Sequence, residues 1–409
     1  MERLTGDPPR LRVALTGNVA LELIAPYFRE AGYEVHGPDS PPLDAFRPDF
    51  VYDVTSHDAV LAEEVPGFFD SRFAKLSGCP YSIDGIHAIV DEFEWERLRA
   101  PKKVLAVDAD NTLWKGILSE DGRDALVPYD DFQKGLRALR DDGVALVLLS
   151  KNDPFELDWF TVCRVNWAPK AGNLLDACRT LNLPPDSAVF VDDNPFERAQ
   201  MSAHLPEVTV APFPDDLTHP RQFLRRLREY FFSGMGETAE DRLRAADYAR
   251  PRPPLRSFAT TADYLDDLAL WVRPSVAAEG DLDRLAQMAG KTNQFNATTI
   301  RRTRRDFEAL LSHPDRRVFV FRAGDRFGEQ GLVCYVVADL ASRRITDFVM
   351  SCRAMGRTLE HFAYDYVSEQ LGYAPAIDFA PTAKNAPFAA FRQALADGTA
   401  GATHFRRVD

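Results

Sequence analysis

The chain has 409 residues, 45% of them hydrophobic and 27% charged, so two or three ordinary soluble domains are expected. The formal net charge of -13 at pH 7 argues against general nucleic-acid binding. The five cysteines are odd in number and show no C-x-x-C spacing, which favours reduced thiols over a disulfide framework or a zinc site.

The first hundred residues predict a small α/β region. Two short apolar runs, 12–18 and 50–54, flank a helix-like segment at 20–31. No acid or nucleophile pattern accompanies His57 or His87, so both are expected to be structural or exposed. The polar N-terminus does not resemble a signal peptide, and the chain shows no apolar stretch long enough for a bilayer. We therefore expect a cytoplasmic protein without membrane contacts.

An apolar strand at 104–107 ends in two carboxylates, Asp108 and Asp110, one residue apart. Strands of open α/β sheets deliver such side chains to the edge where ligands bind. One carboxylate can act as a covalent nucleophile toward phosphorus, and the second can handle the proton of the leaving group. Two anions this close repel unless a cation lies between them, so Mg²⁺ is expected. A solvated acidic turn is the alternative for this short motif alone.

Three later segments add groups that suit phosphate chemistry. The apolar run 143–149 ends in Ser150, whose hydroxyl can hold a phosphate oxygen. Lys170 opens a predicted helix and can balance phosphate charge. A third strand, 188–191, ends in the acidic pair 192–193. Taken singly, the serine suits a helix cap and the lysine a surface position. In this order, the four segments resemble the motifs of the haloacid dehalogenase (HAD) phosphatase superfamily.

The HAD resemblance implies a mechanism and a metal site. Asp108 would attack phosphorus, and Asp110 would protonate the leaving oxygen and then activate water. Asp108, Asp192 and Asp110, the last through its backbone carbonyl, would hold Mg²⁺, with Asp193 or Asn194 completing the shell. The predicted phosphate-binding residues are Ser150, Lys151, Asn152 and Lys170.

The predicted fold is α/β and has three structured parts. A small N-terminal α/β region at 1–100 precedes a HAD-like Rossmannoid domain with a parallel sheet at 101–235. The spacers between the motifs leave room for a small cap or none, so the site stays open to a bulky or protein-tethered substrate. A proline-bearing linker at 236–258 leads to a Gcn5-related acyltransferase-like (GNAT-like) α/β domain at 259–409.

The C-terminal region contains R-x-x-G-x-T between a predicted strand at 344–351 and a helix at 359–371. Free backbone amides at the start of a helix bind anions. The segment resembles the pyrophosphate loop of GNAT enzymes, with Thr358 in place of the final small residue. It would take coenzyme A or the phosphopantetheine arm of a carrier protein, and the alternative is a tight turn with a capped helix. Cys352 is a candidate nucleophile or a buried structural cysteine.

The combined motifs resemble the FkbH-like family over residues 101 to 390. They are Asp108-x-Asp110-Asn111-Thr112-Leu113-Trp114, Ser150-Lys151-Asn152, Asn166-Trp167-x-Pro169-Lys170, Val191-Asp192-Asp193-Asn194-Pro195, Lys291-Thr292-Asn293-Gln294-Phe295-Asn296 and Ser351-Cys352-Arg353-x-Met355-Gly356-Arg357. The resemblance implies an enzyme of polyketide biosynthesis that takes 1,3-bisphosphoglycerate, removes its phosphates and loads the glyceryl unit onto an acyl carrier protein. The carrier or its pantetheine arm would contact Arg353, Gly356, Arg357, Asn293 and Cys352.

One position departs from the family pattern, in which a cysteine commonly lies between the two aspartates of the first motif. Here that position is Ala109, which cannot form a thioester with the acyl group. The chain is therefore an altered form, or a natural variant with a different thiol or reaction. A Mg²⁺-dependent phosphatase without acyl transfer and a non-catalytic carrier-docking scaffold are the alternatives. The basic run 301–305 suits an acidic carrier or a solvated helix face.

Overall fold

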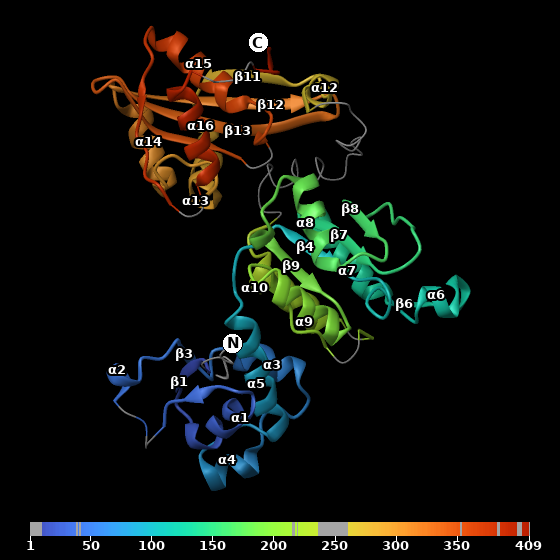
Figure 1. The fold of residues 1–409 in the computed structure, drawn as a ribbon. Helices are drawn as coiled ribbons and strands as arrows, with labels where there is room; N and C mark the ends of the chain where they lie inside the picture. The colour runs from blue at the N-terminus through green and yellow to red at the C-terminus, as the bar shows by residue number, and fades with distance from the viewer. Residues whose placement is uncertain are drawn as a thin grey trace, which may run out of the picture. The chain divides into compact units, whose positions relative to one another are not determined.

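The computed structural model describes residues 10–37, 40, 42–214, 217–218, 220–235, 261–351, 354–382, 385–398 and 403–408 (Figure 1). The predicted linker and two predicted site residues, Cys352 and Arg353, lie outside these residues. The chain divides into two compact units, Met1–Pro101 with Ala211–Ser233, and Lys102–Val210 with Gly234–Asp409. Among the described residues, no helix has the length and apolar character needed to cross a membrane.

The first unit contains a three-stranded parallel sheet in the order β2-β1-β3. Its elements are β1 (Arg12–Thr16), η1 (Leu21–Leu23), α1 (Ala25–Glu30), β2 (Glu34–Val35), α2 (Leu43–Phe46), β3 (Phe50–Asp53), α3 (Asp58–Glu64), α4 (Ser71–Ser77), α5 (Ile83–Glu96) and α10 (Arg221–Phe231). The aromatic rings of Phe28, Tyr52 and Phe93 pack together in its core. This sheet agrees with the small α/β region predicted at the N-terminus.

Helix α10 belongs to the first unit, although its residues fall in the predicted domain 101–235. Arg226 on α10 donates a hydrogen bond through Nε to the carboxylate of Glu92 on α5, at 2.8 Å. Glu92 is completely buried, so this contact lies inside the core of the first unit. Helix α10 therefore lies with the first unit, because it packs against α5.

The segment from Lys102 to Val210 contains a five-stranded parallel sheet in the order β10-β9-β4-β7-β8. Its strands are β4 (Val104–Val107), β7 (Ala145–Ser150), β8 (Val162–Val165), β9 (Ala188–Val191) and β10 (Thr209–Val210), and its helices are α7 (Asp130–Asp141), α8 (Lys170–Leu181), η3 (Pro185–Ser187) and α9 (Pro195–His204). Every residue of β4, β7 and β9 is buried, as expected when both faces of a parallel sheet are covered. The prediction of a parallel α/β sheet is confirmed for this segment.

A small flap follows the first strand of this sheet. It consists of β5 (Trp114–Lys115), α6 (Leu118–Asp121), η2 (Arg123–Ala125) and β6 (Val127–Pro128), and β5 pairs with β6 in antiparallel fashion. The spacing between the motifs predicts an element of this size. A large cap domain is absent from this part of the described chain, which extends without a gap from residue 42 to residue 214.

The C-terminal segment contains a six-stranded sheet in the order β15-β14-β13-β12-β11-β16. The four central strands are antiparallel, and the two edge strands pair in parallel. The elements are α12 (Thr261–Asp267), β11 (Trp271–Val276), η5 (Glu279–Asp281), α13 (Leu282–Lys291), α14 (Arg304–Ser312), β12 (Arg316–Asp325), β13 (Gly328–Asp339), β14 (Arg344–Met350), α15 (Leu359–Leu371), β15 (Ala376–Ile377), α16 (Ala386–Ala396) and β16 (Arg406–Arg407). The segment is mixed α/β, and its GNAT-like assignment stays a prediction.

The basic run at 301–305 is engaged within this C-terminal segment. Arg302 forms a bidentate pair with the buried carboxylate of Asp347 on β14, at 2.8 and 2.7 Å. Arg304 lies 2.7 Å from Asp283, an acid on α13. These pairs tie the chain around the start of α14 to the sheet and to the neighbouring helix, so the run is more than a solvated helix face.

Candidate active site

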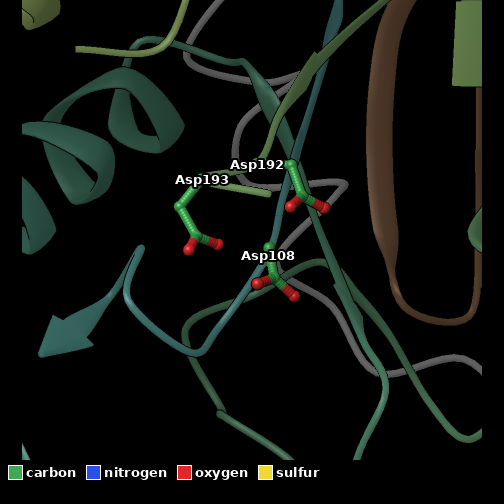
Figure 2. Close-up of side chains that lie close together, drawn as sticks. All are labelled: Asp108, Asp192 and Asp193. Atoms are coloured by element: carbon green, nitrogen blue, oxygen red, sulfur yellow. The ribbon is translucent and has the colours of Figure 1, made fainter. Parts of the chain in front are cut away.

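Two neighbouring parallel strands bring three acids together at their carboxyl ends. Val107, the last residue of β4, is the register partner of Val191, the last residue of β9. The acids that directly follow these strands therefore lie side by side, and Figure 2 shows the side chains of Asp108, Asp192 and Asp193 close together. One oxygen of each lies within 4.8 Å of the others. The structure thus brings together three of the four predicted metal ligands, and their binding of Mg²⁺ stays a prediction.

Lys170 joins this acidic cluster from the first position of α8. Its Nζ lies 2.8 Å from Oδ1 of Asp108 and 2.6 Å from Oδ2 of Asp192. The lysine side chain is 5% exposed, and Asp192 is completely buried. Although burial alone would lower the pKa of Lys170, the two carboxylates raise it, so the side chain stays an ammonium.

The charges of the cluster are out of balance, since one lysine faces three acids. Burial raises the pKa of Asp108 to about 7, against the lowering effect of Lys170 and with the added repulsion of Asp192. Burial also raises the pKa values of Asp192 and Asp193. Ionised acids in a buried site need compensating positive charge. The cluster consists of hard oxygen ligands and therefore suits a divalent cation that prefers oxygen.

The Asp110 carboxylate faces the flap and lies outside the group of three. Its Oδ1 accepts hydrogen bonds from Nε1 of Trp114 at 2.9 Å and from the backbone N–H of Leu118 at 3.0 Å. Its Oδ2 accepts from Nδ2 of Asn152 at 2.8 Å. Donors from the flap and from the loop after β7 orient this side chain, and its carboxylate is not part of the cluster formed by the other three predicted metal ligands. A metal contact from its backbone carbonyl stays a prediction.

The structure brings two of the predicted phosphate-binding residues together and separates a third from them. Nδ2 of Asn152 donates to Oγ of Ser150 at 2.9 Å as well as to Asp110. Ser150 and Asn152 are each 1% exposed. Lys151 instead pairs with Oε1 of Glu197 on α9, at 2.6 Å. Asn152 thus links the hydroxyl at the end of β7 to the second acid of the first motif.

Two residues at the start of α9 support the site and were missed by the sequence analysis. Arg198 donates through Nη1 to the backbone carbonyls of Asp192 at 2.7 Å and Asp193 at 2.6 Å, which fixes the turn that carries both acids. Glu197 is 8% exposed and holds Lys151. Their positions four to six residues after the acidic pair, in the first turn of a helix, were the signal that could have found them.

Three of the described cysteines, Cys163, Cys178 and Cys334, are poor substitutes for a thiol at position 109. Ala109 itself is completely buried. Cys163 is half-buried and lines a cavity of about 500 Å³ beside β8, but burial raises the pKa of its thiol. Burial also raises the pKa of Cys178 to about 11 and that of Cys334 well above the usual range. Raised pKa values disfavour thiolate, the reactive form.

The predicted pantetheine-binding residues are described only in part. Asn293 accepts a hydrogen bond from the guanidinium of Arg301. Arg357 lies 3.3 Å from Oδ2 of the buried Asp325, and Gly356 is exposed with a φ of 70°. Their role in binding a carrier stays a prediction.

These observations define an α/β protein whose segment 102–210 carries a buried acidic cluster and a lysine at the carboxyl edge of a parallel sheet. No protein-family model and no curated protein sequence matches the chain. One similar solved structure is the N-terminal part of the protein BF1531 from Bacteroides fragilis, containing a phosphatase domain complexed with Mg. The TM-score is 0.34 at 21% identity, and the match covers 55% of this chain and 94% of that chain. At these values, the chemistry of this chain has to be judged from its own residues.

Proposed function

We propose that the segment 102–210 is a Mg²⁺-dependent phosphatase of the HAD type. The observation that carries the proposal is the buried cluster of Asp108, Asp192 and Asp193 around Lys170. Three carboxylates in this space offer hard oxygen ligands and an excess of negative charge, which fits Mg²⁺ better than a softer metal. Bound there, Mg²⁺ would supply a Lewis acid that neutralises charge on a phosphoryl group.

The chain's own residues suit the two halves of phosphoester hydrolysis. Asp108 forms a bond from its carboxylate oxygen to phosphorus, and the bond from phosphorus to the leaving oxygen breaks. Asp110 gives its proton to that leaving oxygen, then takes a proton from the water that cleaves the aspartyl phosphate. Ser150 and Lys170 hold the phosphoryl oxygens, and Asn152 keeps Ser150 beside Asp110.

Mg²⁺ should stabilise the protein more at pH 8 than at pH 5. In the metal-free protein, folded Asp108 keeps its proton up to a pKa of about 7, whereas the unfolded residue loses it near its ordinary value of 3.8. The folded state therefore loses stability as the pH rises through this interval, and a bound cation offsets the loss. We expect the rise in thermal midpoint caused by Mg²⁺ to be at least about 2 °C larger at pH 8. Equal shifts at the two pH values would contradict a cation held by Asp108.

The FkbH-like motifs support a finer proposal about the substrate. We propose that the enzyme takes 1,3-bisphosphoglycerate, removes phosphate and transfers the glyceryl unit to the phosphopantetheine thiol of an acyl carrier protein. The chain has only a small flap between β4 and α7 and no large cap there, which agrees with a substrate tethered to a partner. The second candidate is hydrolysis of a small phosphorylated molecule without acyl transfer, which the absence of a thiol at Ala109 favours.

Intact-mass measurement separates these functions. The protein is incubated with Mg²⁺, 1,3-bisphosphoglycerate and a holo carrier protein, and both proteins are weighed while phosphate is assayed. A glyceryl mass on the carrier is the expected result, and the Ala109→Cys variant serves as the thiol-bearing comparison. Phosphate release without transfer in either form would reduce the function to a phosphatase. No reaction in either form would indicate a carrier-docking scaffold and overturn both candidates.

A further inference from the structure

A continuous chain of hydrogen bonds crosses the first unit from an exposed serine to a buried acid. Ser56 and His57 follow the carboxyl end of β3, and Oγ of Ser56 lies 2.9 Å from Nδ1 of His57. Nε2 of the same ring lies 3.2 Å from the hydroxyl of Tyr230 on α10. That hydroxyl donates to Oε1 of Glu92 on α5, at 2.5 Å. The sequence predicts a structural or exposed His57, because two of these partners, Tyr230 and Glu92, lie far from it along the chain.

Glu92, at the buried end of this series of hydrogen bonds, determines which atom donates and which accepts in each of them. Burial alone would raise the pKa of Glu92, but Arg226 and the hydrogen bond from Tyr230 lower it, so Glu92 is a carboxylate. Burial and the neighbouring Glu92 raise the pKa of Tyr230, which stays a phenol and gives its proton to that carboxylate. The phenol oxygen is then the acceptor for Nε2–H of His57. Nδ1 is left with its lone pair and accepts the proton of Ser56.

The surroundings suit a reactive serine rather than a buried structural one. Ser56 is exposed, and the His57 side chain is 15% exposed. The ring of Tyr52 stacks against His57 at an interplanar angle of 17°. Oε2 of Glu96 lies 3.9 Å from Nε2 of the same ring. Tyr230 thus orients the His57 ring through Nε2, and Tyr52 covers one face of the ring, while Ser56 is open to solvent.

The position of the pair in the sheet also favours a ligand site. In the order β2-β1-β3, β2 lies on one side of β1 and β3 on the other. The topological switch point therefore lies between β1 and β3. Ligands of open α/β sheets bind outside the carboxyl ends of strands at such a point. Gly17 follows β1 with a φ of 141°, and a Cβ there would lie 3.0 Å from the side chain of Val54 after β3. The loops after the two strands therefore meet beside Ser56 and His57.

We propose that Ser56 and His57 form a second active site, which cleaves acyl esters or thioesters. Oγ of Ser56 forms a bond to the acyl carbon while Nδ1 of His57 takes the hydroxyl proton and passes it to the departing alkoxide or thiolate. Water then attacks the acyl-serine, giving its proton to His57, and Ser56 leaves with that proton restored. Tyr230 and Glu92 are positioning residues that keep the lone pair of His57 toward Ser56.

A fluorophosphonate probe on the full-length protein tests the proposal. Ser56 would displace fluoride from phosphorus, and the expected result is one added phosphonyl mass per chain, on the peptide that contains Ser56. Ser56→Ala should remove the label, and His57→Gln should slow labelling about 100-fold or more. Ser71→Ala, which changes an exposed serine at the start of α4, should label like the wild type. Tyr230→Phe should shift the pH profile of labelling, an effect that a purely structural role would not produce.

Two results would overturn this second site: no label on Ser56 at probe concentrations that saturate known serine hydrolases, or an equal labelling rate in His57→Gln. Ser56→Ala should also keep the phosphate release of the wild type, because Ser56 plays no part in the proposed phosphatase. The test therefore stands apart from the phosphatase proposal. Ser56→Ala changes only an exposed side chain, so its thermal midpoint should match the wild type and exclude misfolding as the cause of lost labelling.

Discussion

Asp108→Asn should reduce phosphate release below about one thousandth of the wild-type rate, because the amide cannot act as the nucleophile. The fold should persist. Asparagine has nearly the same shape, and Lys170 keeps its 2.6 Å contact with Asp192. In the metal-free protein the substitution also removes one of the three crowded carboxylates. Phosphate release with Mg²⁺ and thermal unfolding without it are the two measurements, and the second should show no loss of stability.

The matched control is Asp131→Asn, which changes an exposed acid on α7 whose ion pair with Lys134 lies at the surface. Surface pairs of this kind contribute about 0–1 kcal/mol, so both phosphate release and thermal midpoint should stay near the wild type. If Asp108→Asn keeps more than a tenth of the wild-type phosphate release, Asp108 is not the nucleophile. A large fall in the thermal midpoint of the same variant would instead assign Asp108 a structural role.

The acidic cluster was predictable because the sequence contains both of its determinants. Fully apolar runs at 104–107 and 188–191 indicate strands buried on both faces, and such strands occur in parallel sheets. Parallel strands end at one edge, so the acids directly after each run meet without any further information. The observed register, in which Val107 is paired with Val191, is the outcome of that rule.

The orientation of Asp110 was not predictable, because it depends on the path of the flap. The indole of Trp114 and the amide of Leu118 reach its carboxylate only after the chain turns back through β5. A short spacer of mixed polar and apolar residues gives no periodic signal for such a turn. The sequence places Asp110 close to Asp108. The direction of its side chain, however, depends on contacts with Trp114 and Leu118, which come four and eight residues later.

The unit to which α10 belongs was not predictable for a related reason. An amphipathic pattern predicts that a helix buries one face, but it does not say which core receives that face. The partner of Arg226 is Glu92, which lies 134 residues earlier in the chain. A similarly long separation conceals one partner of His57, since Tyr230 comes 173 residues later. Contacts of this kind appear only when the chain returns to its first unit after completing the second sheet.

Glu92→Gln should destabilise the first unit by about 3–5 kcal/mol, the usual cost of removing one partner from a buried ion pair. Glu92 is completely buried and accepts hydrogen bonds from Arg226 at 2.8 Å, Arg225 at 3.1 Å and Tyr230 at 2.5 Å. The amide leaves the guanidinium of Arg226 beside a neutral group in the core. Urea unfolding measures the loss, and amide hydrogen exchange in α5 and α10 assigns it to the first unit.

The effect of Glu92→Gln should depend on pH in a defined direction. Arg226 and Tyr230 lower the pKa of Glu92 below its ordinary value of 4.5 despite burial. A depressed pKa contributes stability above the unfolded value and loses it as the pH falls through the folded value. The difference between wild type and variant should therefore be full at pH 7 and shrink below about pH 4.5. Glu34→Gln, which removes the exposed pair between Arg12 and Glu34, should cost at most about 1 kcal/mol at pH 7. Equal losses for the two variants would mean that the buried carboxylate does not hold α10 to α5.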